Sequence, residues 1–264
     1  MSGSGSIFTR LTSDGYDRFM GRYSRELAPL VADHAGVVAP MAVLDVGCGP
    51  GALTAELVKR LGAKAVSACD PSPVFIESVT ANFPGATVKI GAIEALPFPD
   101  NAFDAALAQL VLHFVVDPVK GVSEMMRVTR PGGTVAATVW NNDDEALELV
   151  RVFDAAAPTI ESDQPYKPMK PKFGSAAPVF ALFQQAGLQD VDARPLKVAS
   201  TYANFGEYLE IVQHAQGPIG EFVSKLSDVE MDRLKDALAA ELNHPTGAFT
   251  LTGVASSVIG RVPG

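Results

Sequence analysis

The sequence is poor in basic residues and in cysteine, and both shortages limit what the protein can do. Its 264 residues contain 21 Lys and Arg against 30 Asp and Glu, a net charge of −9, without any cluster of basic residues. Proteins that grip nucleic acid usually present basic patches, so nucleic acid is not an expected partner. The two cysteines, Cys48 and Cys69, cannot form a disulfide framework, and we expect free thiols in a reducing cytoplasm.

Other common features are missing as well. No apolar run approaches the roughly 18 residues of a membrane-spanning helix, so no membrane span is expected. The first six residues lack the basic and apolar regions of a signal peptide and are typical of a flexible tail, which favours a cytoplasmic location. We find neither an internal repeat nor a ligand-spaced His/Cys/Asp cluster, so no metal is expected. With 47% apolar residues the chain is globular, and we expect a monomer or homodimer.

What the sequence does contain is an alternation of short apolar runs with amphipathic segments. Nearly continuous apolar runs separated by helices predict a parallel sheet that is covered on both faces. The expected strands are 41–46, 65–69, 87–90, 103–108 and 134–140. Helices are expected over 16–34, 52–61, from Ser72-Pro73, and from Asp117-Pro118 to the turn before Arg130.

After Trp140 this alternation breaks, and residues 141–174 are richer in Pro, Asp and Lys. Beyond them we expect a helix over 176–186 and two strands, 188–198 and 249–258, that pair as an edge hairpin. Asn204 with Glu207, and Ser227 with Glu230, have the spacing of capping boxes and predict two more helices between those strands.

The most informative segment is Val43-Leu44-Asp45-Val46-Gly47-Cys48-Gly49-Pro50-Gly51, where a strand runs into a glycine loop ahead of a helix. Glycines serve where the backbone must turn sharply and approach a ligand without a Cβ. Dinucleotide sites have the spacing G-x-G-x-x-G and place a pyrophosphate at the helix N-terminus. Here the third glycine comes one residue early, and Asp45 precedes the first by two. Asp45 would repel a pyrophosphate and suits a cation with an ammonium and a sulfonium. Asp70, at the end of the second strand, could accept both hydroxyls of an adenosine ribose or could simply begin the following helix.

Together with several later segments, this loop resembles the class I S-adenosylmethionine-dependent methyltransferases. The similar subgroup contains the ubiquinone- and menaquinone-biosynthesis methyltransferases and other small-molecule enzymes. High-specificity motifs lie within residues 43–133, a moderately specific one lies in 16–24, and the similarity is vague after Trp140. The matching segments beyond the loop are Asp70, 91–98, Phe103-Asp104, 124–133 and 16–24.

The resemblance implies a Rossmann-like α/β fold with a seven-stranded, mostly parallel sheet, one antiparallel edge strand and helical lid insertions. We expect a single domain, residues 1–264. Its parts would be a cofactor-covering N-terminal helix (1–35), a cofactor-binding core (36–140), two substrate lid segments (141–175 and 201–245), and an edge hairpin (176–200 and 246–264).

The resemblance also assigns roles in binding S-adenosylmethionine. Gly47, Cys48 and Gly49 would line its methionine part through backbone, with Asp45 near the amino group. Asp70 would bind the ribose, and the adenine would lie among three residues, Pro71, Ala92 and Ile93. Gln109 would face the methionyl group, while Tyr16 and Arg22 would close over the cofactor. Relatives often carry Asp at the position of Ala92, so here backbone would have to recognise the adenine amino group.

Methyl transfer mainly requires alignment of nucleophile, methyl and sulfur, and a general base helps only if the acceptor must lose a proton. Two histidines are candidate bases. His113 follows the fourth strand, near the expected methyl position, and could equally be packed in a turn. His214 closes the helix that begins at Asn204, where it could serve instead as a cation favouring the helix dipole. Trp140 could stack on an acceptor or belong to the core, and His34 and His244 are expected at the surface.

The hypothesis is methyl transfer from S-adenosylmethionine, giving S-adenosylhomocysteine, to an O, N, C or S atom of a small molecule. Three alternatives stay open. An NAD(P)-dependent oxidoreductase is disfavoured by the early third glycine. A nucleic-acid amino-methyltransferase usually has Asp/Asn-Pro-Pro-aromatic after the fourth strand, where this chain has Gln109-Leu110-Val111-Leu112. A non-catalytic cofactor-binding protein is compatible with the sequence, because this chemistry has no signature catalytic residue.

Overall fold

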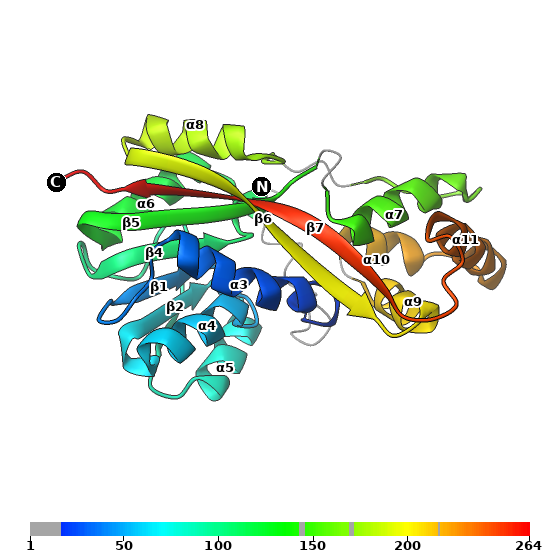
Figure 1. Ribbon diagram of the computed structural model, residues 1–264, viewed down its shortest axis with the longest axis horizontal. Coiled ribbons are helices and arrows are strands. Elements are labelled where there is room, and N and C mark those ends of the chain that lie inside the picture. The colour runs from blue at the N-terminus through cyan, green and yellow to red at the C-terminus, as the bar shows by residue number, and fades with distance from the viewer. Residues whose placement is uncertain (1–16, 143–145, 169–171, 216) are drawn as a thin grey trace.

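The computed structural model describes residues 17–142, 146–168, 172–215 and 217–264, and its centre is one seven-stranded sheet (Figure 1). The strand order is β3-β2-β1-β4-β5-β7-β6. Neighbouring strands from β3 to β5 are parallel, as buried runs linked by helices require. The strands are β1 (Val43–Val46), β2 (Val66–Asp70), β3 (Thr87–Ile90), β4 (Phe103–Gln109), β5 (Thr129–Trp140), β6 (Gln189–Tyr202) and β7 (Phe249–Arg261).

Helices cover both faces of the sheet and enclose one large apolar cluster on each. On one face α3 packs on α4, with α5 beside β2 and β3; on the other, α6 and α8 lie against β5, β6 and β7. The α-helices are α3 (Arg22–His34), α4 (Ala52–Leu61), α5 (Pro73–Asn82), α6 (Pro118–Val128), α7 (Glu148–Ala156), α8 (Ala176–Ala186), α9 (Phe205–Gln213), α10 (Gly217–Val223) and α11 (Asp228–Glu241). The shorter elements are a π-helical segment, η1 (Asp17–Gly21), and three 3-10 turns, η2 (Ala63–Ala65), η3 (Leu112–Phe114) and η4 (Ala157–Thr159).

The single reversed strand is β7, which pairs antiparallel with both β5 and β6. The reversed strand is therefore the second from the edge of the sheet, and the edge strand is β6. The sequence analysis had placed the reversed strand at the edge, and that detail is corrected. The expected edge hairpin is present. It is longer than expected, because β7 continues to Arg261 and β6 to Tyr202.

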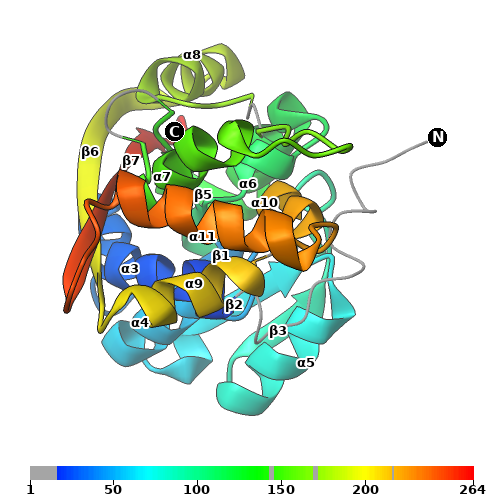
Figure 2. The same ribbon diagram turned by 90° about the vertical axis from the view of Figure 1, so that its right-hand side faces the viewer.

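The hairpin extends beyond the sheet and carries a second group of helices. β5 ends at Trp140, opposite Ala255, whereas β6 and β7 stay paired as far as Tyr202 and Phe249. Figure 1 shows α9 at this far end of the hairpin, near α7, α10 and α11, and Figure 2 shows these helices standing in front of the carboxyl edge of β1 and β2. Both expected lid segments thus contribute to one helical body, which we call the lid; that it covers a substrate stays a prediction.

The lid has its own aromatic core. Phe153 of α7 makes edge contacts with Tyr166 and with Phe222 of α10, at ring-centroid distances of 5.1 and 6.2 Å. Both capping pairs are in place: Asn204 accepts the backbone N–H of Glu207, and Ser227 and Glu230 form a complete capping box. The sequence did not predict α10, a short helix that begins with Gly217-Pro218 and lacks a capping signal.

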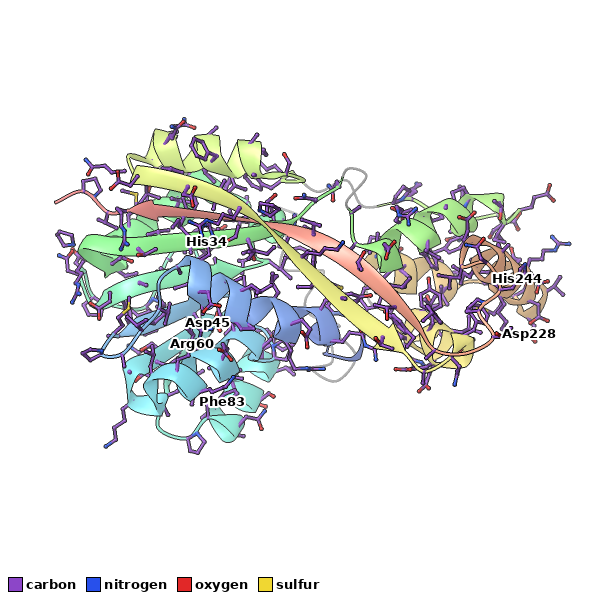
Figure 3. All side chains as sticks on the ribbon, in the orientation of Figure 1. His34, Asp45, Arg60, Phe83, Asp228 and His244 are labelled. Carbon is purple, nitrogen blue, oxygen red and sulfur yellow. The ribbon has the colours of Figure 1, made fainter. Side chains whose placement is uncertain are left out.

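None of the helices in the part of the chain that the structure describes combines the length and the apolarity needed to span a bilayer. The two cysteines are free and buried. His34, expected at the surface, is instead buried at the end of α3 (Figure 3), where its Nδ1 lies 2.8 Å from the Ser257 hydroxyl and its Nε2 lies 3.1 Å from Asp192. Its two partners are more than 150 positions away in sequence, so local pattern carried no sign of them. His244 lies exposed at the far end of the lid.

The capping box of α11 gives a first testable prediction. Ser227→Ala removes the acceptor of the Glu230 N–H and should lower the free energy of unfolding by about 0.5–2 kcal/mol. Ser227→Asn, which retains an acceptor at the N-cap, should stay close to the wild type. Urea denaturation followed by circular dichroism measures both. Equal stability of the alanine variant and the wild type would contradict a stabilising role for this cap.

Candidate functional site

The glycine loop between β1 and α4 has a backbone that only glycine adopts readily. Gly47, Gly49 and Gly51 have φ values of +70°, +51° and +98°, in the left-handed region that costs other residues free energy. A Cβ on Gly47 would also lie 2.6 Å from a methyl carbon of Val111. The loop is therefore a close-packed turn that exposes main chain at the carboxyl edge of the sheet.

The hydrogen-bond donors of this loop are used internally. The N–H groups of Gly47 and Cys48 both donate to the Cys69 carbonyl, at 2.8 and 3.0 Å. The Gly49 N–H donates to Asp70 Oδ2, at 3.0 Å, and the Gly51 N–H to the Cys48 carbonyl, at 2.9 Å. Pro50 has no N–H. A phosphate site needs free N–H groups directed at the ligand, and the loop from Gly47 to Gly51 offers none.

Asp45 occupies the place where a phosphate would otherwise bind. Its carboxylate accepts the Thr54 hydroxyl at 2.6 Å, in the first turn of α4, and the Thr54 backbone also stabilises the charge. An anion is favoured at a helix N-terminus, and here the protein supplies its own. Burial raises the pKa of Asp45 to about 7; the Thr54 hydrogen bond acts in the opposite direction, and the nearby Asp70 charge adds to the rise. The site is thus electrically suited to a cation, which would favour the ionised carboxylate.

Asp70 combines the two roles that the sequence left open. It begins the turn into α5 by accepting the Ser72 N–H at 2.8 Å, and it also holds the glycine loop through Gly49. Burial raises its pKa, and these two backbone hydrogen bonds oppose that rise. Each carboxylate oxygen has a second acceptor position, so both can still accept a ribose hydroxyl.

A pocket opens between the glycine loop and the start of α3. Gln109 lies at its wall and donates from Nε2 to the Ser24 carbonyl at 3.0 Å, while its Oε1 is buried without a hydrogen-bond partner. This unpartnered acceptor fits an ammonium group. The next residue, Leu110, has φ +61°, a strained value for leucine that turns the chain at the end of β4. The residues lining the pocket are Gly21, Ser24, Asp45, Gly47, Cys48, Gly49, Pro50, Ala52, Leu53 and Gln109.

The three residues expected around adenine lie at the carboxyl ends of β2 and β3. Pro71 is exposed and Ala92 is half-buried. Ile93 is buried, and a Cβ on Gly121 of α6 would lie 3.2 Å from its side chain. Pro71 and Ala92 therefore present surface to a ligand, whereas Ile93 mainly supports the core behind them.

The structure separates Arg22 from this pocket. Gly21 and Ser24, three positions apart on one side of the helix start, line it, whereas Arg22 points to the lid. There its guanidinium donates to Glu207 at 2.7 Å and lies 4.4 Å from the centre of the Tyr202 ring. The expectation that Arg22 closes over the cofactor is therefore replaced by a contact with α9. Tyr16 lies outside the described residues, so its expected role is still only a prediction.

Both candidate bases form hydrogen bonds within the protein. His113 Nε2 accepts the Trp140 backbone N–H at 2.9 Å, and burial lowers the pKa of His113 to about 4. Its basic lone pair is thus already in use, and the side chain fastens the turn after β4 to the end of β5. His214 is exposed at the end of α9, where its Nδ1 lies 2.8 Å from the Glu210 carbonyl, so it caps the helix. Both side chains thus have structural hydrogen bonds, and their expected role as bases stays a prediction.

Sequence analysis did not identify Thr54 and Ser24, which form hydrogen bonds with predicted site residues. Thr54 carries no motif signal within an amphipathic helix, and the residue that its hydroxyl serves is known only once β1 and α4 are packed. Ser24 contributes a backbone carbonyl, which no residue pattern reveals. Within the described ranges, no group of three or more His, Cys, Asp or Glu side chains is arranged to hold a metal ion.

Comparison with known proteins shows which proteins this part of the chain is similar to. Residues 44–137, from β1 into β5, match the family model described as a methyltransferase domain. The chain is 38% identical over 135 residues to an uncharacterized methyltransferase of Mycobacterium bovis, and 35% identical over 104 residues to one of Schizosaccharomyces pombe. By these matches, residues 44–137 resemble a methyltransferase domain of the class I S-adenosylmethionine-dependent type.

The match to these methyltransferases is partial in length. The M. bovis alignment covers 50% of this chain and 54% of the relative, so the chain spans about half the length of the curated relatives it matches. A second M. bovis protein, described only as uncharacterized, is 25% identical over 224 residues, with 81% of this chain and 80% of the relative covered. The resemblance to the ubiquinone and menaquinone subgroup stays a prediction.

Solved structures show the same methyltransferase fold. A putative methyltransferase from an antibiotic biosynthesis pathway of Anabaena variabilis aligns with a TM-score of 0.64 at 17% identity, covering 89% of this chain and 98% of its own. The [4+2]-cyclase SpnF aligns with a TM-score of 0.55 at 18% identity, covering 91% of this chain and 81% of its own. At these identities the likeness concerns the fold alone.

The two hydrogen bonds that Asp70 accepts give a second prediction. Asp70→Ala removes the carboxylate that we expect to accept the ribose hydroxyls and leaves the Gly49 N–H without its partner. S-adenosylhomocysteine should therefore bind more weakly by about 1.5–3 kcal/mol. Isothermal titration calorimetry measures the loss, and Asp232→Ala, on an exposed face of the lid, serves as control. Unchanged affinity in the Asp70 variant would show that the carboxylate only shapes the loop.

Proposed function

We propose that the protein transfers a methyl group from S-adenosylmethionine to a small-molecule acceptor. The observation that carries this is the state of the glycine loop: its N–H groups are satisfied within the protein, and a carboxylate stands at the N-terminus of α4. A pyrophosphate at this position would be repelled by the Asp45 carboxylate and would find no free N–H group in the loop to donate a hydrogen bond to it. A ligand with an ammonium and a sulfonium would meet Asp45, Asp70 and the unpartnered Gln109 oxygen instead.

Each part of the ligand would contact a different group of residues. Asp45 and Gln109 Oε1 would hold the ammonium, the glycine loop would lie against the methionine chain, and Asp70 would accept the ribose hydroxyls. Pro71 and Ala92 would contact the adenine. When bound, S-adenosylmethionine supplies an activated methyl group: the acceptor atom gains the carbon, the sulfur takes the electron pair of the broken bond, and the acceptor's proton leaves.

Positioning is the chief task of the protein in this reaction. Among the described residues, the two histidines that we considered as bases are engaged in structural hydrogen bonds. The geometry therefore favours an acceptor that is already nucleophilic, or one whose proton passes to solvent. The cytoplasmic location and the small-molecule class of the acceptor belong to this proposal.

A second candidate function is binding of the same cofactor in a protein with other chemistry. The fold is shared with the [4+2]-cyclase SpnF, and both histidines that we considered as bases form hydrogen bonds within the protein. Release of S-adenosylhomocysteine separates the two functions, because only transfer to an acceptor produces it.

The choice of cofactor is directly testable. S-adenosylmethionine and S-adenosylhomocysteine should bind at micromolar concentration and raise the melting temperature by mass action, whereas NADH should do neither. Calorimetry with all three ligands on the full chain measures this. If neither adenosyl compound binds at millimolar concentration, the proposed function is wrong.

The raised pKa of Asp45 gives a prediction for pH. Below a pKa of about 7 the carboxyl is increasingly protonated and loses its attraction for a cation, so S-adenosylmethionine affinity should fall by up to about tenfold for each pH unit below it. Asp45→Asn is neutral at every pH and should bind weakly with a flat profile. Calorimetry between about pH 5.5 and 7.5 tests this, and parallel profiles for wild type and variant would contradict the role of Asp45.

The stability of the ligand-free protein changes with pH in the opposite direction to the cofactor affinity. Because the folded pKa lies above the unfolded value, the stability tied to Asp45 is fully present below about pH 4 and is lost as the pH rises through about 7. Cofactor binding should therefore stabilise the protein more at neutral pH than at pH 5.5, and the same variant controls for this effect.

A further inference from the structure

The 91–98 loop, which joins β3 to β4, lies beside Asp70 and has no regular secondary structure. Its Gly91 N–H donates to the Asp70 carbonyl at 3.1 Å, so the loop begins next to the residue that we expect to bind the ribose. Within the loop, the Ala95 N–H donates to the Ala92 carbonyl at 3.0 Å. The backbone groups of an irregular segment need partners elsewhere in the protein when they are buried.

The last turn of α6 supplies such partners through Glu124 and Arg127. Glu124 Oε2 accepts the Leu96 N–H at 2.9 Å, and Arg127 donates to the carbonyls of Leu96 and Phe98 at 3.1 and 2.9 Å. Arg127 is itself held by two parallel hydrogen bonds to the Glu124 carboxylate, at 2.7 and 2.8 Å, and by one to Asp100 at 2.6 Å. A paired guanidinium and carboxylate have a defined relative geometry, so this pair fixes the position of the loop backbone.

The rest of α6 contacts the same loop. Where the chain enters the helix, Glu94 Oε1 accepts the Val116 N–H at 3.2 Å. In the middle of the helix, Ile93 packs on Gly121, where a Cβ would lie 3.2 Å from the Ile93 side chain. Gly121 is three positions before Glu124 and therefore lies on the same face of α6. The start, the middle and the end of one helix thus hold the 91–98 loop.

The position of this backbone matters because Ala92 and Ile93 have no polar side-chain atoms. A base beside these two residues could form hydrogen bonds there only with main-chain groups. Hydrogen bonds require donor–acceptor distances of about 2.7–3.2 Å and a nearly linear donor angle. A main-chain group cannot rotate toward a displaced ligand as a side chain can, so the element that holds the loop also determines how accurately a base is recognised.

We propose that Glu124 and Arg127 are positioning residues for the cofactor. By fixing the 91–98 loop, they allow the main chain at Ala92 and Ile93 to distinguish adenine from other purine bases. This rests on the proposed function, because adenine is present only if the ligand is S-adenosylmethionine or its product. Neither side chain contacts the base; both act through the backbone of Leu96 and Phe98.

Two ligands that differ only in the base test this role. S-adenosylhomocysteine carries adenine, with an amino donor next to a ring-nitrogen acceptor. S-inosylhomocysteine carries hypoxanthine, in which a carbonyl acceptor lies next to a ring N–H donor. Main-chain groups that match one edge are mismatched to the other, so the wild type should prefer S-adenosylhomocysteine by at least about tenfold. Isothermal titration calorimetry on the full chain measures both affinities.

The variants remove the pair in two ways. Arg127→Gln and Glu124→Ala should each weaken S-adenosylhomocysteine binding about three- to tenfold and leave S-inosylhomocysteine binding nearly unchanged, so that the preference shrinks. Glu124→Gln keeps an oxygen that can accept the Leu96 N–H and should recover part of the preference. Recovery by this conservative change would not follow from a loss of stability alone.

Arg60 of α4, labelled in Figure 3, offers a matched control. Its guanidinium donates to Glu56 at 2.7 Å, to the Asp33 carboxylate at 2.6 Å and to the Pro29 carbonyl at 3.0 Å, and so joins α4 to α3. Arg60→Gln removes the same kinds of hydrogen bond as Arg127→Gln, at a place away from the 91–98 loop. It should lower the melting temperature to a comparable extent without changing the preference between the two ligands.

Each result supports or overturns the proposal. A folded Arg127→Gln protein with the wild-type preference overturns it, as does an equal loss of affinity for both ligands or a wild type without any preference. If Arg127→Gln does not unfold cooperatively, Glu124→Ala decides by the same criteria. Failure of the wild type to bind S-adenosylhomocysteine contradicts the proposed function, and the positioning role with it. Normal wild-type binding with an unchanged preference in the variants contradicts the positioning role alone.

Discussion

The hydrogen bond between Asp45 and Thr54 is the interaction on which the character of the site depends. It places a buried carboxylate at the N-terminus of α4, where the helix dipole would otherwise attract an anionic ligand. The surrounding loop follows from it, because its N–H groups are free to close on Cys69 and Asp70 when they have no phosphate to bind. This strand–loop–helix unit, shared in outline with dinucleotide sites, is thereby the basis for the cationic ligand that we propose.

The first turn of α3 connects this site to the lid. Ser24 receives the Gln109 amide, Tyr23 reaches Tyr202, and Arg22 reaches Glu207. Three consecutive residues thus contact the end of β4, the end of β6 and the start of α9. Successive side chains on a helix point about 100° apart, so a single turn can contact the cofactor pocket and the lid at the same time. A ligand that changes the position of Gln109 therefore acts on the same helical turn that holds α9.

The sequence predicted correctly those features that are determined by residues close together in the chain. Glycine spacing, the carboxylates at strand ends and the capping pairs are each set by a few neighbouring residues, and the loop, Asp70 and the Ser227 box lie where they were expected. The misassigned residues have distant partners. Arg22 turns toward Glu207, 185 positions away, and His34 is buried against Ser257, 223 positions away. Helical periodicity states which side chains share a face, but the element that covers the face is fixed only by packing.

The same reasoning explains why the cofactor is easier to predict than the acceptor. The proposed cofactor site is made by β1, β2 and β4 with the turns that follow them, and those turns carry motif residues close together in sequence. The lid is built from two segments on either side of β6 and is held by Glu148, which accepts the Thr252 hydroxyl across 104 positions. The sequence pattern of the lid segments is that of an ordinary apolar core.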